Sequence, residues 1–261
     1  MDLQRITGLT SEQLTDLTAG VHHRLGLLAQ PGGRPAVLGL YRSIALAVAL
    51  HRHNLTQDLA GAIFDVSQAT VSRRWDLLRP LIAAELTALI PDPAQITGTS
   101  TALVDGTLAP TWDWKTTEGM YSGKHETTGF NLQLAATLSG DIAAVGPTPA
   151  SGARHDAHAY YASGLYDPLI DSDSILGDKG YQAHADISPT KKPQDGELSQ
   201  EQEANNAVID SVRAAVERAV AHLKTWRMLQ SRYRAPLSKF PEALAVIIGL
   251  YFYTRYFKAY E

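Results

Sequence analysis

The chain has 261 residues, 44% of them hydrophobic and 19% charged, with a net charge of -4 and no cysteine. This length allows one or two domains with sizeable cores, and the absence of cysteine excludes disulfides and cysteine-based zinc sites. The most apolar stretch, residues 36–50, contains Arg42 and is too short to cross a bilayer, and no segment has the pattern of a signal peptide, so we expect no membrane partner.

The N-terminal part of the chain predicts helices. Thr10 and Gln13 have the spacing of a capping box, which indicates a helix that begins there and runs to about residue 28. The Pro-Gly-Gly-Arg-Pro run at residues 31–35 interrupts that helix. A second, strongly apolar helix is expected over residues 36–53.

Two further helices follow closely. Thr56 is placed to cap a short helix over residues 57–64. After a tight turn, Ser67 is placed to cap another helix over residues 68–78, and Pro80 should disturb the pattern beyond it. This arrangement predicts a helix-turn-helix, although an ordinary three-helix packing domain has a similar pattern. The polar residues left for DNA on its second helix are Gln68, Thr70, Ser72, Arg73 and Arg74.

The rest of the chain predicts a mixed α/β region. Pro91-Asp92-Pro93 marks a boundary, so we divide the chain into a helical region, residues 1–93, and an α/β domain, residues 99–261. Strand patterns begin at residue 100, and two alternating segments around a Ser-Gly-Asp turn predict a hairpin. The other expected elements are a short helix over residues 156–164, a strand over residues 174–177 and a helical pattern over residues 199–229.

Charge is unevenly distributed along the chain. Residues 211–261 carry nine Lys or Arg against three Asp or Glu, whereas residues 151–210 carry four against eleven. A carboxylate-rich middle beside a basic tail suits a metal site flanked by a phosphate-binding surface. Alternatively, these charged segments are ordinary solvent-exposed surfaces without a binding role.

Three carboxylates stand in three different kinds of local structure. Asp105 is expected to close a strand, with Gly106 letting the chain turn away, and Asp178 follows a second apolar stretch. Glu217 lies inside the long helical pattern. Converging carboxylates suit a pair of hard divalent cations, which can clamp the attacking and leaving oxygens of a phosphodiester displacement. Taken singly, the two aspartates could cap turns, and Glu217 could pair with Arg213.

Two cations flank the helical glutamate. On an α-helix, Arg213 is rotated from Glu217 by about 40° and Lys224 by about 20°, so all three lie near one face. This face could hold a metal ion through the carboxylate and DNA phosphates through its basic neighbours.

The motifs around these residues resemble those of DDE transposases. Val-Asp-Gly-Thr at 104–107, Gly-Asp-Lys-Gly-Tyr at 177–181 and Arg-x-x-x-Glu-Arg at 213–218 occur in the family's order. The resemblance is to insertion-sequence transposases of the Harbinger-like, family 4 type, and it runs from about Tyr41 to the C-terminus. Further matching pieces are Tyr-Ser-Gly-Lys at 121–124, Gly-Ala-Arg-His-Asp at 152–156, Leu-Lys-Thr-Trp-Arg at 223–227 and the segment 54–73.

The resemblance implies a fold and a chemistry. The fold would be α/β, with an RNase H-like catalytic core behind an all-α helix-turn-helix domain. Asp105, Asp178 and Glu217 would hold two Mg²⁺ ions, which Mn²⁺ could replace. The reaction would be phosphodiester hydrolysis at the element ends, followed by 3′-hydroxyl strand transfer into target DNA.

The resemblance also implies partners and supporting residues. The partner would be double-stranded DNA, at the terminal repeats and the target, with a homodimer acting on it in the cytoplasm at the nucleoid. Lys124, Arg213 and Lys224 would contact DNA phosphates. Asp156 and His155 lie on a separate turn and would stand behind the metal ligands, unless Asp156 caps the helix that follows.

Two other functions remain compatible with this pattern. A domesticated transposase could bind DNA as a regulator without strand transfer, which a footprint without cleavage would favour. A metal-dependent nuclease or phosphohydrolase could use the same carboxylates without strand transfer, although a helix-turn-helix argues against a small substrate.

Overall fold

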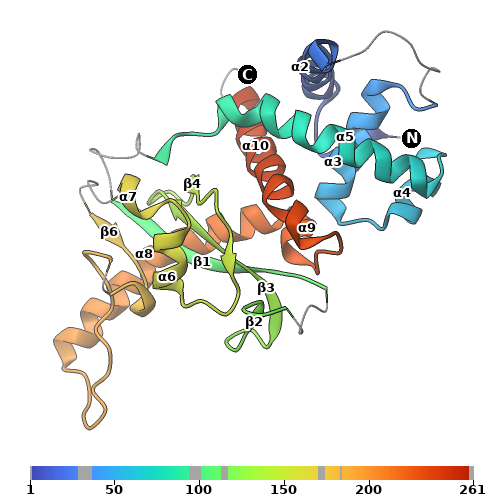
Figure 1. Cartoon of the computed structure of the whole chain (residues 1–261). Helices are drawn as coiled ribbons and strands as arrows, with labels where there is room; N and C mark the ends of the chain where they lie inside the picture. Colours follow the sequence, from blue (N-terminus) through green and yellow to red (C-terminus); the bar gives the residue numbers. More distant parts are fainter. Residues whose placement is uncertain are drawn as a thin grey trace. The chain divides into compact units, whose positions relative to one another are not determined.

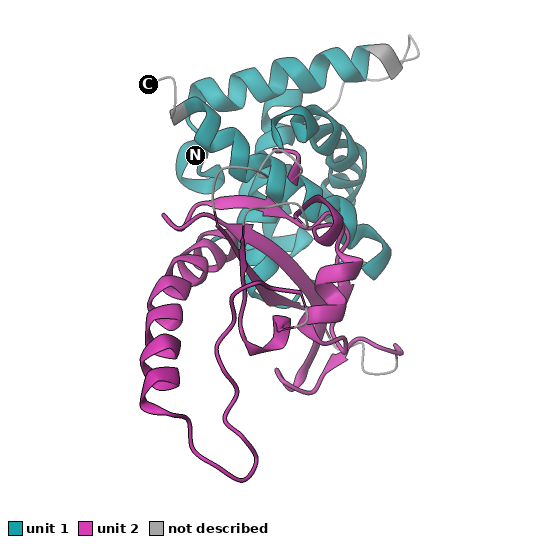
Figure 2. Cartoon of the chain, turned by 90° about the vertical axis from the view of Figure 1, so that its left-hand side faces the viewer, with its two compact units in different colours: residues 1–90, 225–261 teal, residues 91–224 magenta. Residues whose placement is uncertain are grey.

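The structure is a computed structural model of a chain that folds into two compact units (Figure 2). Unit 1 comprises residues 1–90 and 225–261, and unit 2 comprises residues 91–224. In sequence, unit 2 is therefore inserted between the two parts of unit 1. The residues that the structure describes are 2–28, 37–93, 101–112, 117–169, 174–182 and 184–258.

Unit 1 is built from helices around the buried helix α3 (Figure 1). Residues 43–51 of α3 are all buried, which explains why this stretch is so apolar in the sequence. No helix in the described residues is long and apolar enough to cross a membrane. The elements of unit 1 are α1 (Leu3–Thr7), α2 (Ser11–Leu28), α3 (Leu40–His53), α4 (Gln57–Phe64), α5 (Gln68–Leu86), η1 (Thr87–Leu89), α9 (Arg227–Gln230), η4 (Leu237–Lys239) and α10 (Phe240–Lys258).

The predicted caps at the helix starts are confirmed. The backbone N–H of Thr10 donates to Gln13 Oε1 at 2.9 Å, and the N–H of Gln13 donates to Thr10 Oγ1 at 3.2 Å. Thr56 accepts from the N–H of Leu59 to cap α4, and Ser67 accepts from the N–H of Thr70 to cap α5. These caps satisfy backbone donors that have no partner inside the helix.

Helix α5 continues through Pro80, which the sequence predicts as a disturbance. Proline inside a helix removes one hydrogen bond and costs roughly 3 kcal/mol. On the far side of Pro80, Leu81, Ile82 and Leu86 are all buried, and α5 packs along α10. Burial of three such side chains stabilises by about 1.5–3 kcal/mol each, which outweighs the lost hydrogen bond.

The C-terminal end of the expected α/β domain folds elsewhere. The described residues after Lys224, 225–258, belong to the same compact unit as the N-terminal helices, so the expected domain does not form one compact unit. Apolar side chains cover most of α10, and Gly249 permits close packing, since a Cβ there would lie 2.5 Å from Leu86 Cβ. The Tyr253 hydroxyl also donates to the Gln13 carbonyl at 2.6 Å. Such a helix needs a partner on several sides, and the helices of unit 1 supply it.

Unit 2 is a sheet with helices on both faces (Figure 1). The strand order is β2-β3-β1-β6, with β4 and β5 also paired to β3. The predicted hairpin is confirmed as the antiparallel pair β3–β4, while β1 pairs antiparallel with β3 and parallel with β6. The strands are β1 (Ala102–Pro110), β2 (Tyr121–Ser122), β3 (Thr127–Ala136), β4 (Ile142–Val145), β5 (Ala150–Ser151) and β6 (Ile175–Leu176).

The two faces of this sheet are covered by different helices. Helix α6 lies against one face and α8 against the other, and both contact β1 and β3 (Figures 1 and 2). This layered mixture of antiparallel and parallel strands with flanking helices is an RNase H-like core. The helical elements of unit 2 are α6 (Asp156–Ala162), α7 (Tyr166–Leu169), η3 (Lys179–Tyr181) and α8 (Gln200–Lys224).

Candidate active site

Strand register brings Asp105 and Asp178 level with each other. Strand β6 pairs with β1 through Leu103 and Leu176 and ends there. Two residues further along each parallel chain stand Asp105 and Asp178. Because β6 has ended, this edge of β1 is not covered by a strand at Asp105. The structure therefore places two predicted site residues at one edge of the sheet.

The sequence predicts that Asp105 closes its strand, and this prediction is wrong. Asp105 lies in the middle of β1. Strand β1 continues to Pro110, because β3 pairs with it from Leu103, opposite Ala136, to Pro110, opposite Gly129. Gly106 consequently serves close packing rather than a turn. A Cβ at Gly106 would lie 2.6 Å from Gln133 Nε2 and 2.8 Å from Asp156 Oδ1.

Asp156 is held by side chains of neighbouring elements. Its Oδ1 accepts from Asn131 Nδ2 at 2.9 Å, and its Oδ2 lies 3.2 Å from Lys124 Nζ. Asn131 in turn accepts from Gln133 at 2.7 Å, and Gln133 accepts from the Tyr181 hydroxyl at 2.6 Å. A buried chain of hydrogen bonds thus links Asp156 to the turn that follows Asp178.

The alternative role of Asp156 as a helix cap is wrong. Helix α6 begins at Asp156, the N-cap position is His155, and the His155 side chain makes no capping hydrogen bond. The carboxylate of Asp156 is directed to Asn131 and Lys124, which compete successfully for its oxygens. By contrast, Asp178 does cap a turn, because its Oδ1 accepts from the N–H of Gly180 at 2.7 Å.

The aspartates approach β1 from different faces. Val104 belongs to the buried cluster that includes Tyr160 of α6. Since side chains alternate along a strand, Asp105 points to the other face, which α8 covers. Asp156 packs where a side chain of Gly106 would be, on the α6 face. Asp178 follows β6 at the edge between the two faces.

Burial and neighbouring charge make Asp105 a weaker acid than usual. Burial raises its pKa from 3.8 to about 6, and the carboxylates of Asp178 and Asp156 act in the same direction. The N–H of Gly106 and the guanidinium of Arg213 oppose this effect. Negative charge is therefore only partly compensated at this edge of the sheet.

Two cations of helix α8 reach the aspartates. Arg213 Nη2 lies 4.0 Å from Asp178 Oδ2. Burial lowers the pKa of Lys224, and attraction to Asp105 opposes that change. Glu217 lies between these cations along the helix, and its side chain is exposed. Its carboxylate makes no hydrogen bond or ion pair with another described residue.

The structure thus gathers some of the predicted residues and leaves one apart. It brings Asp105, Asp178 and Asp156 close enough to interact electrostatically, with Lys124 and Arg213 beside them. Within the described ranges, no three His, Cys, Asp or Glu side chains form a group arranged to hold a metal ion. A metal-binding role for Glu217 stays a prediction.

A cavity with a basic lining lies beside Asp156. It has a volume of about 180 Å³ and extends from Gly106 of β1 to the turn that ends at Asp156. Burial lowers the pKa of His125, and the neighbouring charges of Lys124 and Lys224 lower it further. Cationic and imidazole side chains in its lining are Lys124, His125, Arg154 and His155.

The residues that orient Asp156 are not among the site residues predicted from the sequence. Asn131 and Gln133 are both buried in β3, and each uses its side-chain amide in the chain from Tyr181 to Asp156. A signal was present, because two polar residues at alternate positions of an apolar strand point to the same face. Buried amides in such positions need specific partners.

In unit 1, the predicted helix-turn-helix forms with its polar residues outward. Phe64, Val71 and Trp75 are buried, as expected for its core. Gln68 and Arg73 are exposed, whereas Thr70 and Arg74 are half-buried. Arg73 donates to Thr70 Oγ1 at 3.3 Å, and Gln68 donates to Gln57 Oε1 at 2.5 Å.

Two family models match the chain in agreement with these two sites. The model of a DDE superfamily endonuclease matches residues 104–251, which include Asp105, Asp178 and Glu217. The model of the helix-turn-helix of DDE superfamily endonucleases matches residues 50–88.

Individual relatives point the same way. A protein described as a transposase for insertion sequence element IS112 in Streptomyces albus G is 30% identical over 226 residues, 86% of this chain and 84% of its own. A second, described as a transposase for IS702 in Microchaete diplosiphon, is 31% identical over 114 residues, 41% of this chain and 40% of its own.

A solved structure also aligns with the chain. It is a piggyBac transposase synaptic complex with hairpin DNA, with a TM-score of 0.44 and 11% identity, and the alignment covers 97% of this chain and 74% of that one.

Proposed function

The chain belongs to the DDE superfamily of transposase endonucleases, and from this premise we propose that it cuts DNA at the ends of an insertion sequence and joins the freed 3′ ends to target DNA. The observation that carries the proposal is the strand register that sets Asp105 level with Asp178. Helix α8, with Arg213 and Lys224, covers the face to which Asp105 points. Carboxylates and cations side by side suit the handling of phosphodiesters near a bound metal.

We further propose that Asp105, Asp178 and Glu217 hold two Mg²⁺ ions, which Mn²⁺ could replace. The donor set fits such ions, because carboxylate oxygens are the ligands that Mg²⁺ prefers. The partly compensated charge around Asp105 also fits, since a bound cation would favour its ionised form. When bound, the two ions would stabilise the attacking and leaving oxygens of the displacement.

The basic residues of the site would position the DNA strand. Lys124, Arg213 and Lys224 would bind the non-bridging oxygens of phosphates, and Asp156 would orient Lys124 through their 3.2 Å ion pair. In the first step, the oxygen of water bonds to phosphorus and the bond to the 3′ oxygen breaks, which leaves a 3′-hydroxyl. In the second, that hydroxyl attacks a target phosphodiester and displaces its 3′ oxygen. Neither step needs a covalent protein intermediate, so a cysteine nucleophile is not required.

We propose that the helix-turn-helix recognises the element ends in double-stranded DNA. Gln68, Thr70, Arg73 and Arg74 of α5 would supply the contacts to bases and phosphates. Because two ends must be processed together, we propose that the protein acts as a homodimer on DNA.

Cleavage of duplexes that carry the element's own ends tests the proposed function. We expect the full chain to release a 3′-hydroxyl strand in Mg²⁺ or Mn²⁺ and to be inactive in EDTA. Glu217→Gln should remove cleavage while leaving the affinity for the duplex unchanged. Glu203→Gln, an exposed substitution on the same helix, is the matched control and should remain active.

Other outcomes would redirect the assignment. A footprint on the element ends without cleavage in either metal would favour a DNA-binding regulator. Cleavage without joining to target DNA would favour a nuclease. If Glu217→Gln is fully active, Glu217 is not a ligand of the metal ions, and Asp105 and Asp178 are the remaining proposed carboxylate ligands.

A further inference from the structure

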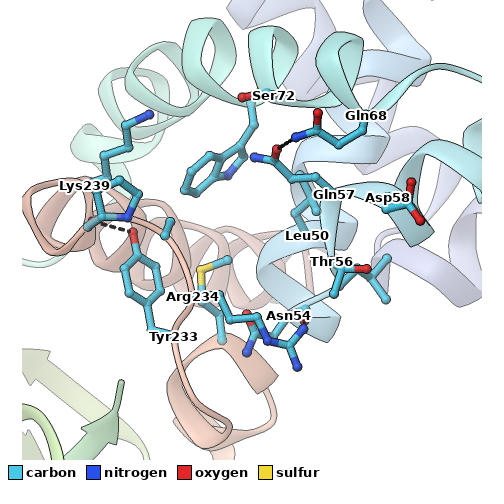
Figure 3. Close-up of a pocket in the computed structure, with 15 residues that line it drawn as sticks. Leu50, Asn54, Thr56, Gln57, Asp58, Gln68, Ser72, Tyr233, Arg234 and Lys239 are labelled. Carbon is cyan, nitrogen blue, oxygen red and sulfur yellow. Dashed lines mark hydrogen bonds between the residues drawn. The ribbon is translucent and has the colours of Figure 1, made fainter. Parts of the chain in front are cut away.

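Unit 1 contains a cavity of about 540 Å³ beside the helix-turn-helix (Figure 3). Its lining comes from two distant parts of the sequence. Gln57, Gln68 and Ser72 come from helices α4 and α5, and Tyr233, Arg234 and Lys239 come from the segment that follows unit 2. Figure 3 shows these six side chains around the same space.

The segment 231–239, which we call the C-terminal segment, is fixed to the turn before α4. The Asn54 amide donates to Ser231 Oγ at 2.8 Å and to the Arg232 carbonyl at 2.9 Å. Arg234 Nη1 donates back to the Asn54 carbonyl at 3.3 Å. Reciprocal hydrogen bonds of this kind hold the segment against the helix-turn-helix.

A second anchor lies at the other end of the C-terminal segment. Lys239 Nζ lies 2.5 Å from Asp76 Oδ1 of α5. The same aspartate lies 3.3 Å from the buried Arg79, whose Nε is 2.6 Å from Glu242 Oε2 of α10. Anchored at both ends, the segment has a defined position beside the first residues of α5.

The side chain that opens α5 is also fixed. The Gln68 amide donates to Gln57 Oε1 at 2.5 Å, and both residues line the cavity. Beyond this bond, the Gln68 amide has an oxygen and a second N–H that could meet the edge of a base. The cavity therefore opens on the same surface that we propose for reading DNA.

Basic charge accompanies that surface. Arg232 and Arg234 are both exposed. Arg234 lines the cavity together with one acidic side chain, Asp58, whereas the charge of Lys239 is paired with Asp76. Figure 3 shows Gln68 and Arg234 on different sides of this cavity. Because phosphate backbones border the major groove, a cation beside a residue that enters the groove can contact a phosphate.

We infer that the DNA-binding surface is composite: α5 contacts the bases, and Arg234 of the C-terminal segment contacts a backbone phosphate of the same duplex. This inference rests on the proposed binding of DNA by the helix-turn-helix and adds a contact that lies outside the matched motif, residues 50–88. The C-terminal segment, which follows unit 2 in sequence, would then complete a DNA-binding surface begun by the helix-turn-helix, which precedes unit 2.

Binding of the full chain to a labelled duplex that carries the element end, measured by anisotropy over a salt series, tests the inference. Arg234→Gln removes the charge but keeps a donor for the Asn54 carbonyl. We expect roughly five- to tenfold weaker binding and a salt slope reduced by about one. A scrambled duplex should be affected equally, because a phosphate contact carries no sequence information.

Arg5→Gln removes the same charge from an exposed position on α1 and is the matched control, which should bind as wild type. An unchanged affinity and slope for Arg234→Gln would overturn the inference. Arg73→Ala separates this failure from that of the premise. If it weakens binding while Arg234→Gln does not, the helix-turn-helix binds DNA without the C-terminal segment. If neither does, DNA binding by the helix-turn-helix is itself wrong.

Discussion

The two units present their proposed functional residues in opposite ways. In unit 2, Asp105 and Asp178 are half-buried, lie beside other charges and sit on a sheet edge. In unit 1, Gln68 and Arg73 are exposed on a capped helix and are oriented by hydrogen bonds to the half-buried Gln57 and Thr70. The proposed catalytic site therefore consists of groups whose charge the fold affects, whereas the proposed DNA-binding surface consists of groups whose orientation the fold determines.

This difference predicts different responses to substitution. In unit 2, removing one charge should change the protonation and ligand affinity of its neighbours, because they interact at short range in a partly buried place. In unit 1, removing one side chain should subtract its own contact and little else.

The largest effect is expected from replacing Asp178. Asp178→Asn keeps the oxygen that caps the turn at Gly180 but removes the charge that we propose for metal binding. It should fold normally and show no cleavage in Mg²⁺ or Mn²⁺, and Asp105→Ala should be equally inactive. Cleavage of element-end DNA and thermal unfolding would be measured on the same preparations.

Comparing Asp156→Asn with Asp178→Asn identifies which of these two aspartates binds the metal together with Asp105. An asparagine can still accept from Asn131 but loses the ion pair with Lys124, so activity should fall yet remain measurable. An inactive Asp156→Asn together with an active Asp178→Asn would show that the metal site uses the carboxylate on the α6 face instead.

An intermediate effect is expected on stability as a function of pH. The pKa of Asp105 is raised to about 6, so metal-free protein gains stability from this group below pH 4 and loses it as pH rises through 6. Asp105→Asn should therefore be more stable than wild type at pH 7.5, by on the order of 3 kcal/mol relative to their difference at low pH. Urea unfolding in EDTA at several pH values would measure this difference.

The metal should abolish that pH dependence. Adding Mg²⁺ at pH 7.5 should stabilise wild type, because the ionised carboxylate then has a cation to bind. Asp105→Asn should gain less from the same addition. If the stability of wild type and of the variant changes with pH in the same way from pH 4 to 7.5, the pKa of Asp105 is not raised by burial and neighbouring carboxylates.

The sequence predicted those parts of the fold that local chemistry decides. Each helix cap joins residues only three positions apart, so the caps could be predicted directly from the sequence. They are formed by the pair Thr10 and Gln13, by Thr56 and by Ser67. The hairpin of β3 and β4 is likewise local. The ordering of Asp105, Asp178 and Glu217 could be recognised as a pattern, although it did not reveal their distances.

Long-range packing decided what the sequence did not predict. Helix α5 passes Pro80 because α10, more than 150 residues later, covers its apolar side. Asp105 lies within its strand because β3 extends the pairing on both sides of it. Asp156 turns to Asn131 and Lys124 rather than to its own helix. In each case the deciding partner is distant in sequence, where periodicity and capping rules carry no information.

The smallest and most local effect is expected from the two arginines of α5. Arg73 is exposed and Arg74 is half-buried, and as neighbours on a helix they point about 100° apart, so they cannot make the same contact. We expect one single-alanine variant to weaken binding to all duplexes and to lower the salt slope by about one, which identifies a phosphate contact. The other should weaken binding mainly to the element end, by about 1–3 kcal/mol, which identifies a base contact. Cleavage at saturating protein should be nearly unchanged in both, since neither residue belongs to unit 2. A double Arg73→Ala, Arg74→Ala variant that binds element ends as tightly as wild type would show that the helix-turn-helix has another role.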